Sequence, residues 1–212
     1  MKEKPIIFKP EMVKAILQGV KTQTRRISRG YENIMERQTD LYSIGVPEGT
    51  EIQPIEDAFM DKCPYKVGDI LWVRETWHEM ACHKPECKSK CPLGKNCPCY
   101  TYKSQHFGPD IKWKPSIFMP RKAAHLFLEV KSVRIEKLQK ITPEDCVNEG
   151  AVKKPHYMTY GGESWLAIHG RYKTEFAKLW DSINAKRGYS WESDPWVYVI
   201  EFMRLPKGGE NE

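Results

Sequence analysis

The sequence lacks the features of membrane-spanning, secreted and repeat proteins. No apolar run approaches the length of a membrane span, the N-terminus has no secretory signal core, and no segment repeats at a fixed period. The chain has seven cysteines but no secretory signal, which argues for a reducing environment and against disulfides. We therefore expect a soluble, cytoplasmic protein that has no membrane partner.

Negative charge is scarce in one short region. Over the whole chain 34 basic and 28 acidic residues give a net charge of +6, which is compatible with nucleic-acid binding but does not require it. Residues 21–29, however, contain basic side chains and no Asp or Glu. The first part of this region combines an amine, two hydroxyls and two guanidiniums in the order Lys21-Thr22-Gln23-Thr24-Arg25-Arg26.

The backbone conformation of this stretch decides which of its side chains can act together. In an extended chain successive side chains point to opposite faces. One face then carries Thr22, Thr24 and Arg26, and the other carries Lys21, Gln23 and Arg25. A turn would instead bring Lys21 and Thr24 together. A lysine near a hydroxyl is a possible base and nucleophile pair, and the arginines can hold phosphate. A solvated basic linker is the structural alternative.

The pattern of apolar residues and turn signals predicts an α+β protein. At 212 residues the chain is long enough for one domain, which we place at 1–206 with a polar tail at 207–212. Two polar or cysteine-rich stretches, at 28–66 and 78–112, interrupt the pattern and are expected to be insertions. The remaining segments predict a mixed sheet or small barrel with flanking helices. We expect strands over 5–9, 70–77, 125–135 and 196–204, and helices over 10–20, 142–150 and 172–183.

Four segments, taken in order, resemble the ASCH domain family of the PUA-like superfamily. The segment 19–26 resembles the family's G-x-K-T-x-T-x-R signature, and 67–73 resembles the turn and strand that follow it. The segment 127–130 is similar to the central strand with its acidic residue, and 199–202 to the closing strand. The resemblance implies a PUA-like mixed β-barrel. The longer form of this chain resembles versions encoded by phages and prophages.

The resemblance also implies a chemistry and a set of catalytic residues. Small bacterial members of the family are amidohydrolases that remove an acetyl group from the exocyclic amine of acetylcytidine. Their proposed catalytic lysine, threonine and glutamate match Lys21, Thr24 and Glu129 here. Another member is similar to a single-strand ribonuclease. The expected partner is therefore RNA or a modified nucleoside, and a non-catalytic RNA-binding module is the alternative.

Further side chains are candidates for holding the substrate. Tryptophan can stack on a nucleobase and arginine can contact phosphate, although core packing and solvated strand ends explain the same residues. The candidates for substrate or RNA binding are Thr22, Arg25, Arg26, Trp72, Arg74 and Arg121.

Cysteines are concentrated in the second insertion. Five of the seven fall within eighteen residues that carry few aliphatic side chains, so this loop has little with which to form a core. Zinc would supply the missing stabilisation through four Cys or His ligands. Reduced free thiols are the alternative. We expect a structural zinc site with ligands drawn from Cys82, Cys87, Cys91, Cys97 and Cys99.

Overall fold

The computed structural model describes residues 1–28, 60–81, 98–106, 108, 111–152 and 165–206. The chain divides into two compact units, each assembled from separate stretches. Unit 1 contains residues 1–19, 69–129 and the segment from 204 onward, and unit 2 contains residues 20–68 and 130–203.

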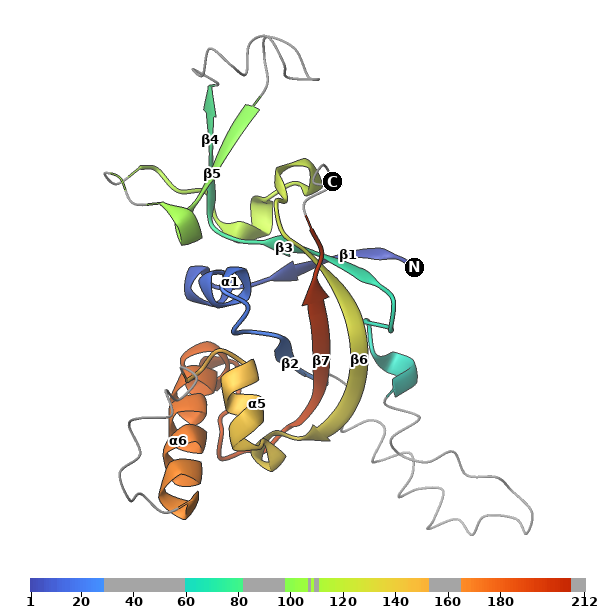
Figure 1. Cartoon of the computed structure of the whole chain (residues 1–212), viewed down its shortest axis with the longest axis vertical. Coiled ribbons are helices and arrows are strands. Elements are labelled where there is room, and N and C mark those ends of the chain that lie inside the picture. The colour runs from blue at the N-terminus through green and yellow to red at the C-terminus, as the bar shows by residue number, and fades with distance from the viewer. Residues whose placement is uncertain (29–59, 82–97, 107, 109–110, 153–164, 207–212) are drawn as a thin grey trace, which may run out of the picture. The chain divides into compact units, whose positions relative to one another are not determined.

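The strands of unit 1 form a sheet with one buried face. Strand β1 (Glu3–Ile7) pairs in parallel with β3 (Ile70–Arg74), and β3 pairs antiparallel with the start of β6 (Phe127–Lys137). Figure 1 shows β1 and β3 side by side. The apolar residues alternate as a half-buried sheet requires. The inward positions are occupied by Ile6, Leu71, Val73 and Leu128.

Unit 1 also contains a helix and a two-stranded hairpin. Helix α1 (Pro10–Leu17) starts at a proline, whose missing N–H costs nothing in the first turn, and buries Val13 and Ile16. The hairpin pairs β4 (Trp77–Ala81) with β5 (Pro98–Tyr102). It packs through Trp77 on Met119 and Ala123. Three 3₁₀ turns follow β5: η2 (Lys103–Gln105), η3 (Ser116–Phe118) and η4 (Arg121–Ala123).

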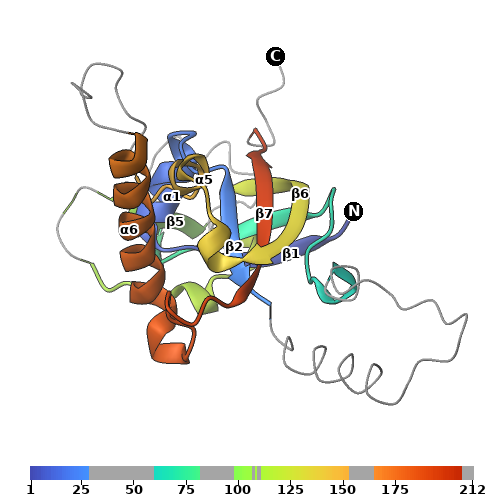
Figure 2. The ribbon, with the colours of Figure 1, turned by 90° about the horizontal axis from the view of Figure 1, so that it is seen from below.

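Unit 2 combines strands with two helices. Strand β2 (Gln23–Ile27) pairs antiparallel with β7 (Trp196–Arg204). Helix α5 (Pro143–Asn148) lies between β2 and the long helix α6 (Trp165–Asn184), as the two views in Figures 1 and 2 show. The short turns η5 (Leu138–Lys140) and η6 (Ala185–Arg187) flank these elements. Their shared core consists of Leu138, Ile141, Cys146, Val147, Tyr172, Phe176, Trp180, Val197 and Val199.

Helix α5 is fixed at its start by a capping box. The Thr142 hydroxyl accepts a hydrogen bond from the Asp145 N–H, and the Asp145 carboxylate accepts one from the Thr142 N–H, both at 3.1 Å. Pro143 occupies the first turn and Glu144 adds a second acid there. These features satisfy N–H groups that a short helix would otherwise leave unpaired. The predicted helix start at 142 is therefore confirmed.

The α+β class predicted from the sequence is confirmed. The strand order of the main sheet is β1-β3-β6-β7-β2. Among the described strands this order is open, with β1 and β2 at its two ends, and no closed barrel is present in this part of the chain. The division of the chain into one domain stays a prediction. No helix in the described ranges has the length and apolar character that crossing a bilayer demands.

Three boundaries differ from those expected. The predicted strand over 70–77 ends at Arg74, and Trp77 begins the separate strand β4; Glu75, between the two strands, is fully buried. The predicted insertion over 78–112 contains β5 and most of β4, whose aromatic residues pack into unit 1. Helix α6 begins at Trp165, before the expected helix start at residue 172. The predicted insertion over 28–66 lies mostly outside the described residues.

Removal of the capping hydroxyl tests how much α5 depends on its first turn. Thr142→Ala leaves the Asp145 N–H without its acceptor, so we expect a loss of about 1 kcal/mol in the free energy of unfolding. Urea denaturation measures this change. Thr174→Ala, at an exposed position of α6, is the matched control and is expected to stay within about 0.5 kcal/mol of wild type. Equal losses in both variants would contradict the capping role.

Candidate functional site

The basic stretch is an extended strand, and this sets the site in unit 2. Strand β2 begins at Gln23, and its register with β7 places Thr24 opposite Ile200. Side chains on one face of this segment reach α5, as alternation predicts. They are Lys21, Gln23 and Arg25, which bond to Glu149, Asp145 or both.

Lys21 is a buried cation held at the C-terminal end of α5. Its Nζ lies 2.8 Å from each of three acceptors: the backbone oxygens of Gln23 and Glu149, and Oε2 of Glu149. An ammonium group has three protons, so these three acceptors match its full donor capacity. The Thr22 N–H donates to the Asn148 carbonyl beside it at 2.9 Å. Lys21 therefore also satisfies a carbonyl that the end of the helix leaves open.

The surroundings of Lys21 shift its protonation in opposite directions. Burial lowers the pKa of the Lys21 amine below its ordinary value, while the charge of Glu149 and its hydrogen bond raise it. The charges of Arg26 and Arg25 add to the lowering. The net shift of the Lys21 pKa is downward, so the neutral amine forms at a lower pH than in an ordinary lysine. A neutral amine is the form that can act as a base.

Arg25 binds three carboxylates from two further elements. Its guanidinium donates to Glu149 at 3.2 Å, to Asp145 at 3.0 Å, and to Glu136 on β6. Only 1% of its side chain is exposed, so the charge is compensated inside the protein. The guanidinium also lies 5.8 Å from the centre of the Phe176 ring. Arg25 thus organises the acids of the site.

Asp145 connects the capping box to this cluster. Its two carboxylate oxygens accept hydrogen bonds from Gln23 at 3.0 Å, Arg25 at 3.0 Å, Arg134 at 3.2 Å and the Thr142 N–H at 3.1 Å. Burial raises the pKa of the Asp145 carboxyl, but these donors and charges outweigh burial and hold it below its ordinary value. Asp145 therefore stays ionised well into the acid range.

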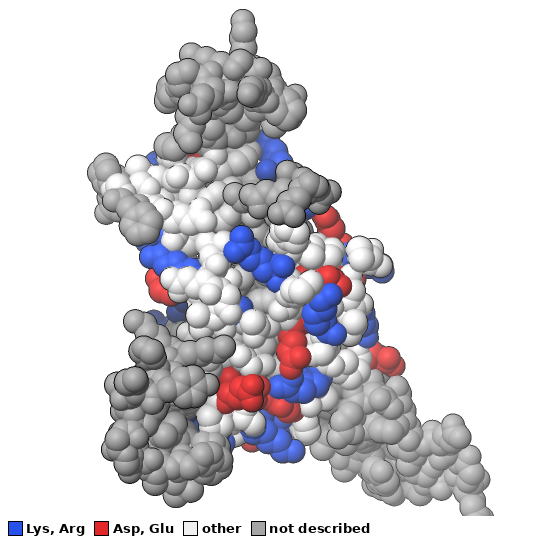
Figure 3. All heavy atoms as spheres, viewed as in Figure 1, with Lys and Arg blue, Asp and Glu red and all other residues white. Residues whose placement is uncertain are grey.

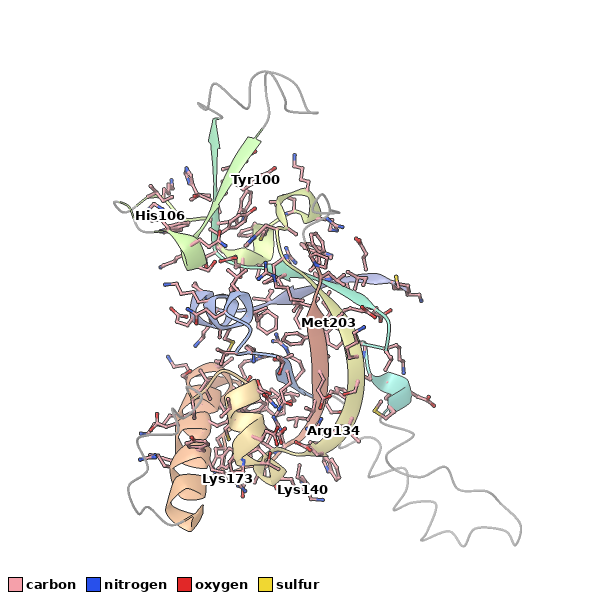
Figure 4. The ribbon with its side chains drawn as sticks, in the orientation of Figure 1. Tyr100, His106, Arg134, Lys140, Lys173 and Met203 are labelled. Atoms are coloured by element: carbon pink, nitrogen blue, oxygen red, sulfur yellow. The ribbon has the colours of Figure 1, made fainter. Side chains whose placement is uncertain are left out.

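The exposed border of the cluster carries both signs of charge. Arg134 on β6 contacts Glu136, Asp145 and Glu201. Figure 4 labels Arg134 on its strand, and Figure 3 shows acidic and basic atoms adjoining on the same side of unit 2. The acids accompany the cations here, so this part of the visible face is not a continuous basic patch.

The opposite face of the β2 segment holds the remaining predicted residues. Thr24 is buried, whereas Thr22 is exposed. Arg26 is half-buried, and burial lowers the pKa of its guanidinium, against which the charge of Glu149 acts. The extended strand thus brings Lys21 and Thr24 into one short segment of unit 2, on different sides of its backbone.

The other predicted residues belong to unit 1. Glu129 lies on β6 opposite Ile70 of β3, and its relation to Lys21 stays a prediction. Trp72, Arg74 and Arg121 also belong to unit 1, where each arginine lies over an aromatic ring.

Glu149 is the carboxylate that the sequence reading missed. It is almost fully buried and contacts both Lys21 and Arg25. One signal pointed to it: an acid at the C-terminal end of a helix opposes the helix dipole, so it needs a cation nearby. Glu149 stands in this position, directly before Gly150, whose positive φ of 73° ends the helix.

A second polar cluster, also missed, lies in unit 1. Glu75 is fully buried and accepts a hydrogen bond from the Ser104 N–H at 3.2 Å. Its other oxygen lies 2.8 Å from Nε2 of His125, whose ring stacks on Tyr102 with 3.8 Å between ring centres. These bonds compensate a carboxylate that would be costly to bury alone. They join the residue after β3 to η2 and to the segment before β6, and the ring stack adds β5.

The expected zinc ligands are mostly outside the described residues. Cys82, Cys87, Cys91 and Cys97 lie there, and only the backbone of Cys99 is described, opposite Met80 in the hairpin. Among the described side chains, no group of three His, Cys, Asp or Glu is arranged to hold a metal. Cys63 and Cys146 are buried free thiols, and burial raises the pKa of Cys146 to about 12.

Comparison with known proteins gives one structural likeness. No protein-family model and no curated protein matches the chain. A solved structure, the high-resolution crystal structure of an ASCH domain from Lactobacillus crispatus JV V101, aligns with 96% of this chain and 79% of its own. The two share 12% sequence identity with a TM-score of 0.37. It carries the family name that the motifs resemble.

Replacement of Arg25 tests whether the cluster depends on its charge. Arg25→Met keeps much of the side-chain volume but leaves Glu136, Asp145 and Glu149 without their common cation. We expect a loss of about 3–5 kcal/mol in the free energy of unfolding at neutral pH, the usual cost of removing one partner from buried charges. Urea denaturation at several pH values measures it.

The pH dependence gives the sign of this effect. In wild type the lowered pKa of Asp145 contributes stability above its unfolded value of 3.8, and that contribution is lost as the pH falls. Without Arg25 the crowded carboxylates take up protons more readily, so the gap between variant and wild type should narrow as the solution is acidified. Lys178→Met removes an exposed cation from α6 and is the control. A gap that is constant with pH would contradict the role of Arg25.

Proposed function

We propose that this protein hydrolyses an acyl amide on a modified cytidine, as a nucleoside or within RNA, through Lys21, Thr24 and Glu149. The observation that carries the proposal is the buried contact between Lys21 Nζ and Glu149 Oε2 at 2.8 Å, with the buried hydroxyl of Thr24 three residues along the chain. The ordered resemblance to ASCH domains supports it, since the lysine and threonine match that family's amidohydrolase residues.

In this proposal Glu149 takes the role that the resemblance gave to Glu129. A carboxylate must lie near the base and nucleophile to act on the same acyl group. Glu149 contacts Lys21 directly. Glu129 therefore stays a prediction, and it provides a test against Glu149.

The proposed reaction has two halves, with Lys21 acting in the first and Glu149 in the second. In the first half, substrate binding turns residues 21–24 out of the extended form that holds Lys21 and Thr24 on opposite sides of the backbone. Neutral Lys21 then accepts the proton of the Thr24 hydroxyl, whose oxygen attacks the acyl carbon. The bond from carbon to nitrogen then breaks, and the leaving amine takes the proton from Lys21. Water, deprotonated by Glu149, attacks the acyl-threonine, and the Thr24 oxygen leaves with the proton that Glu149 received. The products are the free amine and a carboxylic acid, which releases its proton to the solvent.

The protonation of Lys21 is the critical requirement. Its lowered pKa favours the neutral form, while the three acceptors around Nζ favour the ammonium. Arg25 weakens the stabilisation of the ammonium form, because it shares the Glu149 carboxylate with Lys21. In the proposal, the bound substrate displaces water and competes for one of the three acceptors of Lys21 Nζ. The amine is then held less tightly as an ammonium and can act as a base.

The same saturated contacts also support a second candidate function. A lysine whose three donors are held by a helix end, a carboxylate and the backbone oxygen of Gln23 on β2 serves structure without chemistry. The protein would then be a non-catalytic RNA-binding module, or a single-strand ribonuclease whose chemistry lies elsewhere. Its phage or prophage origin would follow from the same family resemblance.

Turnover of acetylcytidine, free and within single-stranded RNA, tests the first function. Thr24→Val keeps the shape of the side chain but removes the nucleophile, and should reduce kcat at least about a thousandfold, while Thr24→Ser should retain turnover. Glu149→Gln should reduce kcat roughly 10²–10⁴-fold, and Glu129→Gln should stay within about threefold of wild type. Liquid chromatography of the released cytidine measures all four variants.

Folding and RNA binding are measured on the same variants as controls. Circular dichroism shows whether each variant keeps its secondary structure, and the Thr24→Ser result separates a lost hydroxyl from lost packing. If wild type turns over neither substrate while RNA binding persists in every variant, the non-catalytic module is the correct description. If Glu129→Gln and not Glu149→Gln loses activity, the carboxylate has been assigned wrongly.

We also propose a structural zinc in the cysteine-rich segment that the hairpin carries. The ladder between β4 and β5 ends at the pair Ala81 and Pro98, so the hairpin fixes both ends of this segment together. Cys82 and Cys97 are the next residues along the chain. Four thiolates from this group would suit zinc, and closing the segment beforehand reduces the entropy cost of ordering it.

Metal analysis of the purified protein tests this site. We expect about one equivalent of zinc, a reduced content in the double variant Cys82→Ser with Cys97→Ser, and release by a chelator. Cys63→Ala, outside the cysteine group, should keep the metal and is the control. Less than about half an equivalent in wild type would count against a structural site.

A further inference from the structure

We propose that the outer sheet face of unit 1 is a platform for single-stranded nucleic acid, with Trp72 and Phe127 as its stacking centre. This inference concerns a surface distinct from the cluster around Lys21, and it does not depend on the hydrolysis proposed above.

The strand register places the two aromatic rings side by side. Trp72 on β3 pairs directly with Phe127 on β6, in an antiparallel ladder. The neighbouring pair, Leu71 with Leu128, is fully buried and faces the interior. Since side chains alternate along a strand, Trp72 and Phe127 share the opposite, outer face. Directly paired residues have side chains close enough to form one surface.

Each ring of this pair carries a guanidinium. The Arg74 guanidinium carbon lies 5.3 Å from the centre of the Trp72 ring, and that of Arg121 lies 4.4 Å from the centre of the Phe127 ring. A guanidinium close to an aromatic ring is attracted to the face of that ring, and its own plane is a surface on which a base can stack. The two adjacent rings therefore form two stacks, each with a planar cation close by.

An exposed apolar turn borders these stacks. The Arg74 guanidinium donates to the backbone oxygen of Ile117, which brings the η3 turn beside Trp72. Ile117 is 56% exposed and Phe118 is 68% exposed. Large apolar side chains at this exposure, next to aromatic and cationic groups, are typical of a binding surface. Phe118 therefore offers a further ring for stacking.

The chemistry of this surface favours nucleic acid over a protein partner. Bases stack on aromatic and guanidinium planes, and phosphates pair with arginine, so one polymer satisfies both features of the surface. A single strand is required because duplex bases present no open faces. Glu3 competes with a phosphate for Arg121. It accepts two hydrogen bonds from Arg121, at 2.7 and 2.8 Å, in an exposed ion pair. An exposed pair of this kind is exchanged readily for a phosphate.

Fluorescence anisotropy with a labelled single-stranded RNA of roughly 12 nucleotides tests the platform on the full-length protein. Phe118→Ala should weaken binding on the order of tenfold, as removal of one stacking ring does. Arg121→Gln should weaken binding several-fold and reduce the salt dependence by about one phosphate contact. Glu3→Gln should strengthen binding, because it releases Arg121. All three positions are exposed, so their variants are expected to fold.

Matched controls separate this surface from a general charge effect. Val67→Ala removes an exposed apolar side chain in unit 2, and Lys178→Gln removes an exposed cation from α6. Neither should change the affinity by more than about twofold. If acetylcytidine is not hydrolysed but the platform variants behave as stated, only the catalytic proposal fails.

Four results would overturn the platform. They are no RNA binding by wild type, unchanged affinity in both Phe118→Ala and Arg121→Gln, equal affinity for duplex RNA of the same sequence, and weaker binding by Glu3→Gln. A concentration-dependent dimer that Phe118→Ala abolishes, together with no RNA binding, would assign this face to a second copy of the chain.

Discussion

The buried charge of Arg25 is the constraint on which unit 2 depends. A guanidinium in the interior is tolerated only if carboxylates and hydrogen bonds replace the water it has lost. Here the carboxylates come from β6 and from both ends of α5, so one side chain fixes the helix against two strands. Lys21 adds a second buried cation that shares Glu149 with Arg25. The fold around this site is therefore determined by charge compensation as much as by apolar packing.

The same charge compensation fits both a catalytic and a structural role for Lys21. A catalytic lysine must be desolvated to lose its proton, and a structural lysine is desolvated when it closes a helix end. Lys21 meets both descriptions. The two functions differ in Thr24, because a hydroxyl is indispensable for attack on an acyl group but adds little to a helix cap on the other side of the strand.

Local sequence rules predicted the parts of the protein that local forces determine. Alternation in an extended chain gave the face shared by Lys21, Gln23 and Arg25, and the cap at Thr142 gave the start of α5. Glu149 was missed because its partners are more than a hundred positions away in the chain, and no periodic pattern connects residues at that separation. The β4–β5 hairpin was missed for a different reason, since cysteine and lysine dominate the segment it carries and hide the alternation of its short strands.

Asp145 has a consequence for how unit 2 would respond to a ligand. The same carboxylate closes the first turn of α5 and binds Arg25, so occupancy of the site and the helix–coil equilibrium of α5 are thermodynamically linked. Linkage is reciprocal: a ligand that draws Arg25 away from Asp145 loosens the helix, and fraying of the helix weakens the hold on Arg25 by the same free energy. The stability of the short helix α5 therefore depends on whether Asp145 keeps its contact with Arg25.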